Sequence, residues 1–227
     1  MKPTESQSEE FTSALEEHAT LFTLRLNAHE ISRLRAYYEL VMAWNARLHL
    51  VAPCPPAEFA TRHVLESLLA LEHLPDGARV GDVGSGAGLP IIPCLIVRPR
   101  LRATLIEASP KKAIFLREAL RQLNAQDRAE VVSERFEKIS PPEADVLTCR
   151  ALERLTEMLP QLIRWSKPVV KAWLLFGGRE LLAAITRVAA DNPTDALTCR
   201  SVLIPESERR FLYVVERDQK PEARSRR

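Results

Sequence analysis

The chain confines its glycines to two places. Of seven glycines in 227 residues, five lie between residues 77 and 88, and the other two form the pair Gly177-Gly178. Within the cluster, the run Asp82-Val83-Gly84-Ser85-Gly86-Ala87-Gly88 reads G-x-G-x-G behind an acidic residue. Because glycine adopts backbone conformations closed to other residues and lets a backbone approach a ligand, the run predicts a tight, ligand-binding turn.

The apolar pattern around this turn predicts alternating strands and helices. A strand over 78–83 enters the turn and a helix over 89–97 leaves it. Further strands are expected at 103–107, 129–133, 145–148 and 169–176, and helices at 110–123, 152–163 and 179–190. Two closing strands, 201–204 and 211–215, predict a hairpin. This alternation is typical of an α/β fold: a Rossmann-like, mostly parallel sheet covered on both faces, with a C-terminal antiparallel hairpin.

The N-terminal third has a different pattern. Apolar residues recur at helical spacing from Ile31 to Leu48 and again from Phe59 to Leu71, and three prolines at 53, 55 and 56 separate the two runs. We therefore expect a disordered tail over 1–9, a helical extension over 10–75, a ligand-binding domain over 76–216 and a basic tail over 217–227.

The identity of the ligand follows from the turn and one further carboxylate. Glu107 ends the second predicted strand, 25 positions after Asp82, where a carboxylate accepts both hydroxyls of a ribose. A dinucleotide fingerprint reads G-x-G-x-x-G, whereas here the third glycine comes one residue early, and Asp82 would repel a pyrophosphate. S-adenosylmethionine, with its ammonium and sulfonium groups, suits Asp82 better than NAD. A purely structural tight loop is the plain alternative.

Several short motifs are spread over most of the chain. They are Trp44-Asn45, Arg62-His63-Val64-Leu65-Glu66-Ser67, the run from Asp82 through Leu89-Pro90-Ile91-Ile92-Pro93, Lys111-Lys112 with Phe115-Leu116-Arg117, and Asp145 through Ala151. In order and spacing, from about Leu34 to Val215, they resemble the bacterial 16S ribosomal RNA guanine-N7 methyltransferases, the glucose-inhibited division protein B family. The resemblance implies a class I methyltransferase that uses S-adenosylmethionine to methylate N7 of a guanine in 16S ribosomal RNA.

The resemblance also implies roles for individual residues. Besides Asp82, Gly86 and Gly88 of the turn, Gly84 and Leu89 would contact the cofactor, and Glu107 would hold its ribose. Phe136 and Glu137 would flank the adenine, and Arg150 would lie beside the cofactor and the incoming base. Basic residues that would face the RNA are Arg135, Arg150, Arg209, Lys111 and Lys112. No catalytic acid or base is assigned, because guanine N7 already carries a lone pair.

The chain departs from the family pattern at four places. Ile91 stands where a glycine is usual, Glu66 where an aspartate is usual, and His49-Leu50-Val51 where N-L-T is usual. Gly177-Gly178 ends the fifth strand in place of a lysine-glycine pair. None of these changes touches Gly84, Leu89 or Glu107, so the prediction of cofactor binding is unaffected, whereas the lost lysine bears on the RNA side.

Composition narrows the alternatives only partly. A net charge of +2 does not by itself indicate nucleic acid, but residues 98–121 hold seven basic side chains against two acidic ones, which fits either a phosphate-tracking face or a solvated helix. A methyltransferase of another RNA, a protein or a small molecule, and a non-catalytic ribosome-assembly factor, stay open as alternatives. The scattered cysteines predict neither a metal site nor disulfides, and no apolar run predicts a membrane span. We expect a cytoplasmic monomer whose partner is 16S ribosomal RNA or the small ribosomal subunit.

Overall fold

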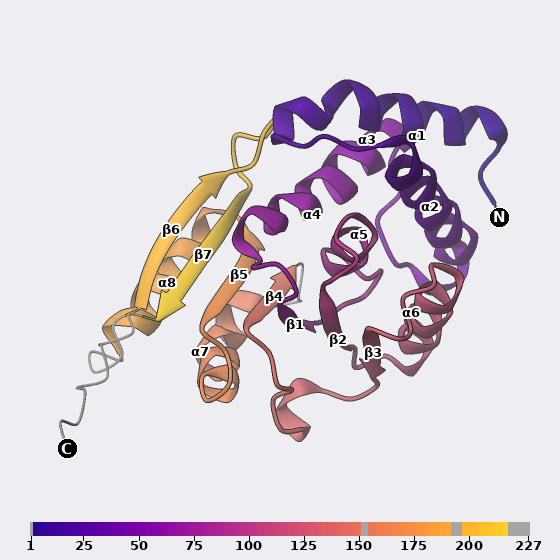
Figure 1. Cartoon of the computed structure of the whole chain (residues 1–227). Helices are drawn as coiled ribbons and strands as arrows, with labels where there is room; N and C mark the ends of the chain where they lie inside the picture. Colours follow the sequence, from indigo (N-terminus) through magenta and orange to yellow (C-terminus); the bar gives the residue numbers. More distant parts are fainter. Residues whose placement is uncertain (1, 151–153, 192–196, 218–227) are drawn as a thin grey trace, which may run out of the picture.

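A single twisted sheet forms the centre of the chain (Figure 1). The computed structural model describes residues 2–150, 154–191 and 197–217. Within them seven strands lie in the order β3-β2-β1-β4-β5-β7-β6. The first five in chain order pair in parallel, and β7 pairs antiparallel with both β5 and β6. The strands are β1 (Arg79–Val83), β2 (Arg102–Ile106), β3 (Ala129–Val132), β4 (Val146–Arg150), β5 (Ala172–Gly177), β6 (Leu197–Leu203) and β7 (Phe211–Arg217).

The strand order places a crevice above the central strand. From β1 the chain crosses to β2 and β3 on one side, then returns to β4 and β5 on the other, so Asp82 of β1 is flanked by Leu105 of β2 and Thr148 of β4. Ligands of open α/β sheets bind at this reversal of strand order, outside the carboxyl ends of the strands. The fold thus confirms the predicted mostly parallel sheet with its antiparallel hairpin.

Helices cover both faces of the sheet and bury two apolar cores. Alternate residues of a strand point to opposite faces, and accordingly Leu105 lies in one core and Ile106 in the other. One core receives the N-terminal helices, α5 and α6, and the other receives α7 and α8. The helices are α1 (Glu5–His18), α2 (Ala28–Leu48), α3 (Pro56–Glu58), α4 (Glu66–Leu68), α5 (Ile91–Val97), α6 (Pro110–Gln122), α7 (Leu155–Ser166) and α8 (Arg179–Ala190).

Short turns of tighter or wider helix complete the chain. The 3₁₀ segments are η1 (Ala19–Phe22), η3 (Leu69–His73) and η4 (Phe136–Lys138), and η2 (Phe59–Leu65) is a π-helix. The second apolar run of the extension is therefore one continuous but irregular helical stretch. π-Helical turns are rare and frequently lie at functional sites, and this one carries Arg62 and His63. No described helix combines the length and apolarity that a membrane span requires.

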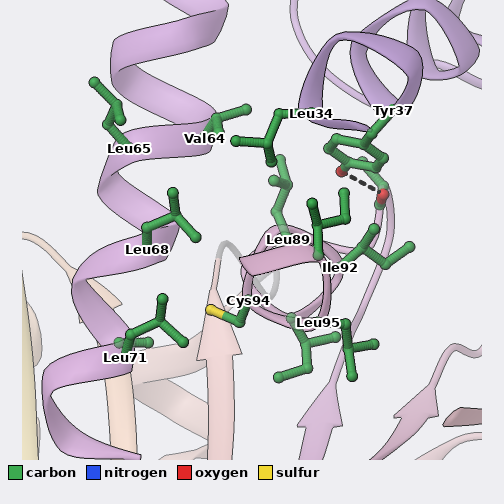
Figure 2. Close-up of a cluster of buried hydrophobic side chains, with 14 of the residues drawn as sticks. Leu34, Tyr37, Val64, Leu65, Leu68, Leu71, Leu89, Ile92, Cys94 and Leu95 are labelled. Carbon is green, nitrogen blue, oxygen red and sulfur yellow. Dashed lines mark hydrogen bonds between the residues drawn. The ribbon is translucent and has the colours of Figure 1, made fainter. Parts of the chain in front are cut away.

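The N-terminal extension packs tightly onto α5. Figure 2 shows Leu34 and Tyr37 of α2, together with Val64 and Leu68 of the η2–α4 stretch, meeting Leu89, Ile92 and Leu95. Every one of these side chains is less than 9% exposed. Removing apolar surface from water stabilises the fold, so these buried contacts make the extension part of the main core.

The prediction of a disordered tail over residues 1–9 is wrong for residues 5–9. They form the first turns of α1, where Thr4 and Gln7 close a reciprocal capping box. Ser8 is buried and donates a 2.9 Å hydrogen bond to Glu39 of α2. The polar composition of this segment gave no sign of a helix, because the residue that Ser8 contacts lies 31 positions away.

Several predicted boundaries also shift. The helix expected from residue 89 begins at Ile91, because residues 84–90 stay in the turn. The helix expected over 152–163 is α7 (Leu155–Ser166), and residues 151–153 lie outside the described part. The strand expected from 169 begins at Ala172, whereas β6 begins earlier than expected, at Leu197. Beyond Arg217, which ends β7, the predicted basic tail lies outside the described residues.

Candidate active site

A cavity of about 760 Å³ opens at the carboxyl ends of the parallel strands. Residues that end four of them line it: Val83 of β1, Ile106 of β2, Arg150 of β4 and Gly177 of β5. Its volume lies within the range of small-molecule and cofactor sites. The cavity therefore sits at the point that the strand order favours for a ligand.

The glycine turn forms the floor of the cavity. The backbone N–H groups of Gly84 and Ser85 donate to the carbonyl of Ile106, at 2.9 and 3.2 Å, which ties the turn to β2. Gly88 has a φ of +87°, and a Cβ there would lie 2.3 Å from Cδ1 of Ile92. Glycine at 88 is thus required both by the backbone conformation and by the close approach of α5. Gly84, Gly86 and Leu89 line the cavity, whereas Gly88 does not line it and packs against α5.

Glu107 is held in place by the backbone on both sides of it. One carboxylate oxygen accepts from the N–H of Gly86 and the other from the N–H of Ser109, each at 2.8 Å. The residue is 8% exposed and lines the cavity. Each oxygen keeps a lone pair for a further donor, so the fixed carboxylate can accept two more hydrogen bonds from the cavity.

Asp82 lies beneath the turn, fully buried, and does not line the cavity. Its Oδ1 accepts a 2.7 Å hydrogen bond from the Thr148 hydroxyl, and its Oδ2 has no hydrogen-bond partner in the described part of the chain. Burial raises the pKa of Asp82 to about 7. The structure therefore does not bring Asp82, a predicted cofactor contact, into the cavity lining, and its raised pKa favours the neutral carboxyl over a buried charge.

The predicted adenine contacts lie at the other end of the cavity. Phe136 and Glu137, in η4, both line it. Phe136 is buried and packs edge-on against Trp165, with ring centroids 5.3 Å apart. The Trp165 indole donates to the carbonyl of Ile139 at 2.7 Å and anchors this segment. Trp165 thus supports an apolar wall of the cavity.

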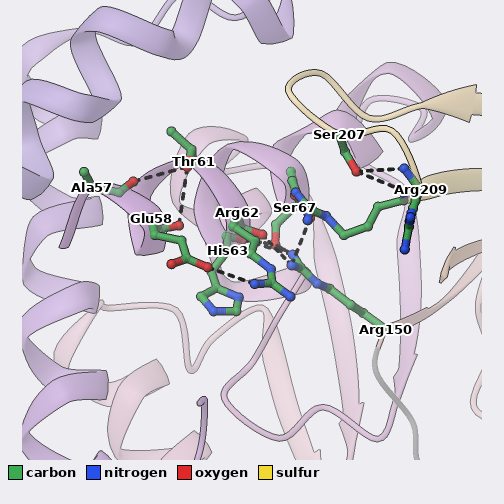
Figure 3. Close-up of polar contacts among 11 residues, drawn as sticks. Ala57, Glu58, Thr61, Arg62, His63, Ser67, Arg150, Ser207 and Arg209 are labelled. Atoms are coloured by element: carbon green, nitrogen blue, oxygen red, sulfur yellow. Dashed lines mark hydrogen bonds and ion pairs between the residues drawn. The ribbon is translucent and has the colours of Figure 1, made fainter. Parts of the chain in front are cut away.

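Arg150 lines the cavity but is directed at the N-terminal extension. Its Nη1 donates to the carbonyl of His63 at 3.1 Å and to the hydroxyl of Ser67 at 2.8 Å, and its Nη2 donates to the carbonyl of Arg62 (Figure 3). The guanidinium lies 5.6 Å from the Phe176 ring centre, and the side chain is only 11% exposed. Arg150 is therefore a structured part of the wall, beside any bound cofactor, rather than a free cation for RNA phosphates.

Glu66 joins Arg150 to an arginine that the sequence did not single out. Its buried carboxylate pairs with Nη2 of Arg150 at 3.2 Å and with Nη2 of Arg210 at 2.6 Å. Burial raises the pKa of Glu66, and the two guanidiniums oppose that shift. Nothing in the sequence pattern distinguishes Arg210 from Arg209, because their roles depend on which side chain turns inward at the start of β7.

His63 lines the cavity as a neutral ring. Burial, together with Arg150, Arg62 and Arg210, lowers the pKa of His63 to about 3. Its ring packs against Phe59, with centroids 5.0 Å apart. The ring thus packs within η2, and it also presents a neutral donor and acceptor to the cavity.

The predicted RNA-facing residues differ in whether they line the cavity. Lys112 and Arg135 line the cavity, and Arg135 is exposed. Lys111 and Arg209 are exposed and lie outside the lining (Figure 3 shows Arg209 beside Ser207). These basic residues thus come from α6, from the position that precedes η4 and from the β6–β7 connection, and of them only Lys112 and Arg135 line the cavity.

The departures at Ile91 and Gly177 have local explanations. Ile91 is fully buried and contributes to the core beneath the turn. Gly177 lines the cavity, and a Cβ there would come within 2.7 Å of Leu181 Cδ2 and 3.2 Å of Leu181 Cβ. Leu181 of α8 occupies the space that a side chain at position 177 would need, so glycine fits at this position where the usual lysine would not.

Asn45, noted in the sequence only beside Trp44, orients another part of the cavity wall. Its amide nitrogen donates to the carbonyl of Val51 at 3.1 Å, and its amide oxygen accepts from the N–H of Val51 at 3.0 Å. Leu50, Val51 and Ala52 line the cavity. The side chain therefore fixes the backbone of the segment that follows α2.

Known proteins match the chain in sequence. The family model described as "GidB: rRNA small subunit methyltransferase G" matches residues 30–204. A relative named ribosomal RNA small subunit methyltransferase G from Gluconobacter oxydans is 37% identical over 172 residues, covering 74% of this chain and 84% of that protein. A protein of the same name from Xanthomonas axonopodis pv. citri is 42% identical over 135 residues, covering 59% of this chain and 63% of its own length.

Solved structures share the fold at low identity. A cofactor-bound protein from MTB, Rv0187, is similar with a TM-score of 0.58 at 18% identity, covering 82% of this chain and 89% of that one. A SAM-dependent methyltransferase from Aquifex aeolicus is similar with a TM-score of 0.53 at 18% identity, covering 70% and 93%. The fold is that of the class I methyltransferases, and the sequence matches show that the chain belongs to the GidB family, rRNA small subunit methyltransferase G.

Proposed function

We propose that the chain transfers a methyl group from S-adenosylmethionine to N7 of a guanine in 16S ribosomal RNA. Family membership supports the cofactor and the ribosomal RNA, and the N7 position follows the family that the motifs resemble. One observation of the site carries the proposal. Glu107 is fixed by Gly86 and Ser109 at the edge of a cavity whose floor is the glycine turn.

The residues present fit this cofactor. Glu107 would accept the ribose hydroxyls, and the turn at Gly84 and Gly86 would approach the cofactor with its backbone. Phe136 would pack against the adenine. When bound, S-adenosylmethionine supplies a methyl group activated by its sulfonium.

The protein's part in the reaction is positioning. Guanine N7 uses its own lone pair, so no residue needs to remove a proton first. A cavity that holds N7, the methyl carbon and sulfur in line can account for a large share of the rate through orientation alone. The neutral imidazole of His63 fits this reading, because a ring with a pKa near 3 is too weak a base to take up a proton at neutral pH.

The basic rim supports RNA as the substrate. Lys112 and Arg135 line the cavity, and Lys111 and Arg209 lie exposed beyond it. Such side chains contribute salt-dependent affinity through contacts with phosphates. We further propose that the chain acts in the cytoplasm as a monomer, a state that light scattering on the purified protein would test.

The test is transfer of a labelled methyl group from S-adenosylmethionine to three acceptors: protein-free 16S ribosomal RNA, intact small subunits and a protein fraction. Mapping of N7-methylguanosine should then show a single modified guanine that is unmodified without the enzyme. Label in the protein fraction alone, or an unchanged map, would contradict the proposal.

A further inference from the structure

One wall of the cavity contains more positive than negative charge. Arg62, Arg150 and Arg210 gather there with two carboxylates, Glu58 paired to Arg62 and Glu66 paired to the other two arginines. His63 adds no charge at neutral pH, since its pKa lies near 3. The wall therefore has one positive charge in excess, directed at a cavity that it helps to line.

Glu66 alone cannot neutralise both of its partners. Its side chain is 3% exposed, and it pairs through one oxygen with Arg150 and through the other with Arg210. Taking charges out of water is expensive unless each finds an opposite charge. The two arginines therefore share one carboxylate, which leaves one of them able to pair with an anion from outside the described chain.

Arg210 is the member of the cluster that can meet such an anion. The four hydrogen bonds of Arg150 use both of its terminal nitrogens, and its side chain is 11% exposed. Arg210 is 37% exposed, and Glu66 accepts from its Nε at 2.9 Å and its Nη2 at 2.6 Å. Its Nη1 makes no hydrogen bond to another described residue.

The segment that carries Arg210 is held rigidly. The Ser207 hydroxyl accepts from the backbone N–H of Arg210 at 3.0 Å, and the carbonyl of Arg210 accepts from the N–H of Ile204 at 3.0 Å. From the far side, His18 of α1 contacts Glu206 at 2.9 Å. The guanidinium is thus positioned before any ligand arrives, which lowers the entropic cost of binding.

We propose that Arg210 binds a backbone phosphate of the target nucleotide and that Glu66 is the positioning residue that aims it. This inference rests on the proposed RNA substrate. A guanidinium binds phosphate oxygens through paired N–H groups. A nucleotide whose base enters the cavity leaves its phosphate at the rim, where Arg210 is partly exposed. The arrangement thereby separates Arg210, which touches the RNA, from Arg150, which stays in the wall.

The experiment compares Arg210→Ala and Arg210→Lys in the full chain with Arg102→Ala as control. Arg102 is an exposed arginine at the amino end of β2, away from the carboxyl ends of the strands that border the cavity. Affinity for 16S ribosomal RNA is measured at several KCl concentrations, affinity for S-adenosylmethionine is measured without RNA, and thermal unfolding confirms the fold.

We expect Arg210→Ala to weaken RNA binding and to lower the slope of log affinity against log salt by about 1, as loss of one phosphate contact does. Arg210→Lys should keep the slope but bind RNA more weakly, because it loses the paired geometry. Arg102→Ala should match the wild type in both measurements. Cofactor affinity should stay within about twofold in all three variants.

Glu66→Gln separates positioning from contact. Both guanidiniums remain in this variant, so the salt slope of RNA binding should be kept while kcat falls at least about tenfold. A purely structural role of Glu66 would lower both the salt slope and kcat. If Glu66→Gln does not fold, Arg210→Ala still decides the question. A folded Arg210→Ala with an unchanged slope would overturn the proposal. So would a large loss of cofactor affinity without RNA, which would assign the anion to the cofactor's carboxylate. Failure of the wild type to methylate ribosomal RNA would instead defeat the proposed function.

Discussion

The hydroxyl of Tyr37 donates a 2.8 Å hydrogen bond to the backbone carbonyl of Ala87, fifty residues away and inside the glycine turn (Figure 2). Both residues are buried, Tyr37 completely. Burial also raises the pKa of Tyr37, so its hydroxyl stays protonated and remains a donor. The second helix of the N-terminal extension is therefore tied to the loop that is proposed to hold the cofactor.

Tyr37→Phe should loosen this loop. The change leaves the Ala87 carbonyl buried without its donor, which costs about 1–3 kcal/mol. We expect weaker binding of S-adenosylmethionine by calorimetry and a lower melting temperature. Tyr38→Phe is the matched control, because Tyr38 contributes through stacking of its ring on Phe11 at 4.5 Å. Equal effects of the two changes would show that the hydrogen bond has no special part in cofactor binding.

Gly88→Ala should be more damaging than Gly77→Ala, although both glycines have positive φ. At Gly77 (φ +71°) a Cβ meets no atom within 4 Å, so alanine there adds only backbone strain, roughly 1–2 kcal/mol. At Gly88 the same Cβ collides with Ile92, which adds about 1–3 kcal/mol of overpacking. Chemical denaturation of both variants tests the difference. Similar losses in the two would mean that α5 yields to the methyl group.

Asp82→Asn should alter how stability depends on pH. Burial raises the pKa of Asp82 to about 7, above its ordinary value of 3.8. The folded state then holds the proton more tightly, so this residue's contribution is fully present below pH 3.8 and is lost as pH rises through about 7. The free energy of unfolding of the wild type relative to Asp82→Asn should fall by up to about 4 kcal/mol across that window. A difference independent of pH, measured by denaturation at each pH, would contradict the shifted pKa.

Glu107→Ala should abolish tight cofactor binding. The change removes the proposed ribose acceptor and leaves the N–H groups of Gly86 and Ser109 without their partner. The two hydrogen bonds proposed between the Glu107 carboxylate and the ribose hydroxyls are charge-assisted, at about 1.5–3 kcal/mol each. Their loss predicts at least a hundredfold rise in the Kd for S-adenosylmethionine. Glu130→Ala is the control, because Glu130 is exposed on β3, next to β2, and accepts a hydrogen bond from the Thr104 hydroxyl. Comparable affinity in Glu107→Ala and the wild type would place the ribose elsewhere.

The sequence by itself determined the sheet and the cofactor end of the site. The glycine turn, Glu107 at the end of the next strand, and the alternation of apolar runs are local patterns. Each depends on residues close together in the chain, because periodicity and turn chemistry act over a few positions. They were sufficient to predict the parallel sheet, the hairpin and a nucleoside-binding crevice, and the motifs around them pointed to the family to which the chain belongs.

Only the tertiary structure decided the other half of the site. Glu66 meets Arg150 across 84 positions and Arg210 across 144, and α1 acquires its partner Glu39 from α2. The contacts of Glu66 depend on which side chain turns inward where α4, the end of β4 and the start of β7 meet, and no local pattern encodes that. Arg210 and Arg209 are identical neighbours in the sequence, yet packing pairs the first with a buried carboxylate and leaves the second in solvent.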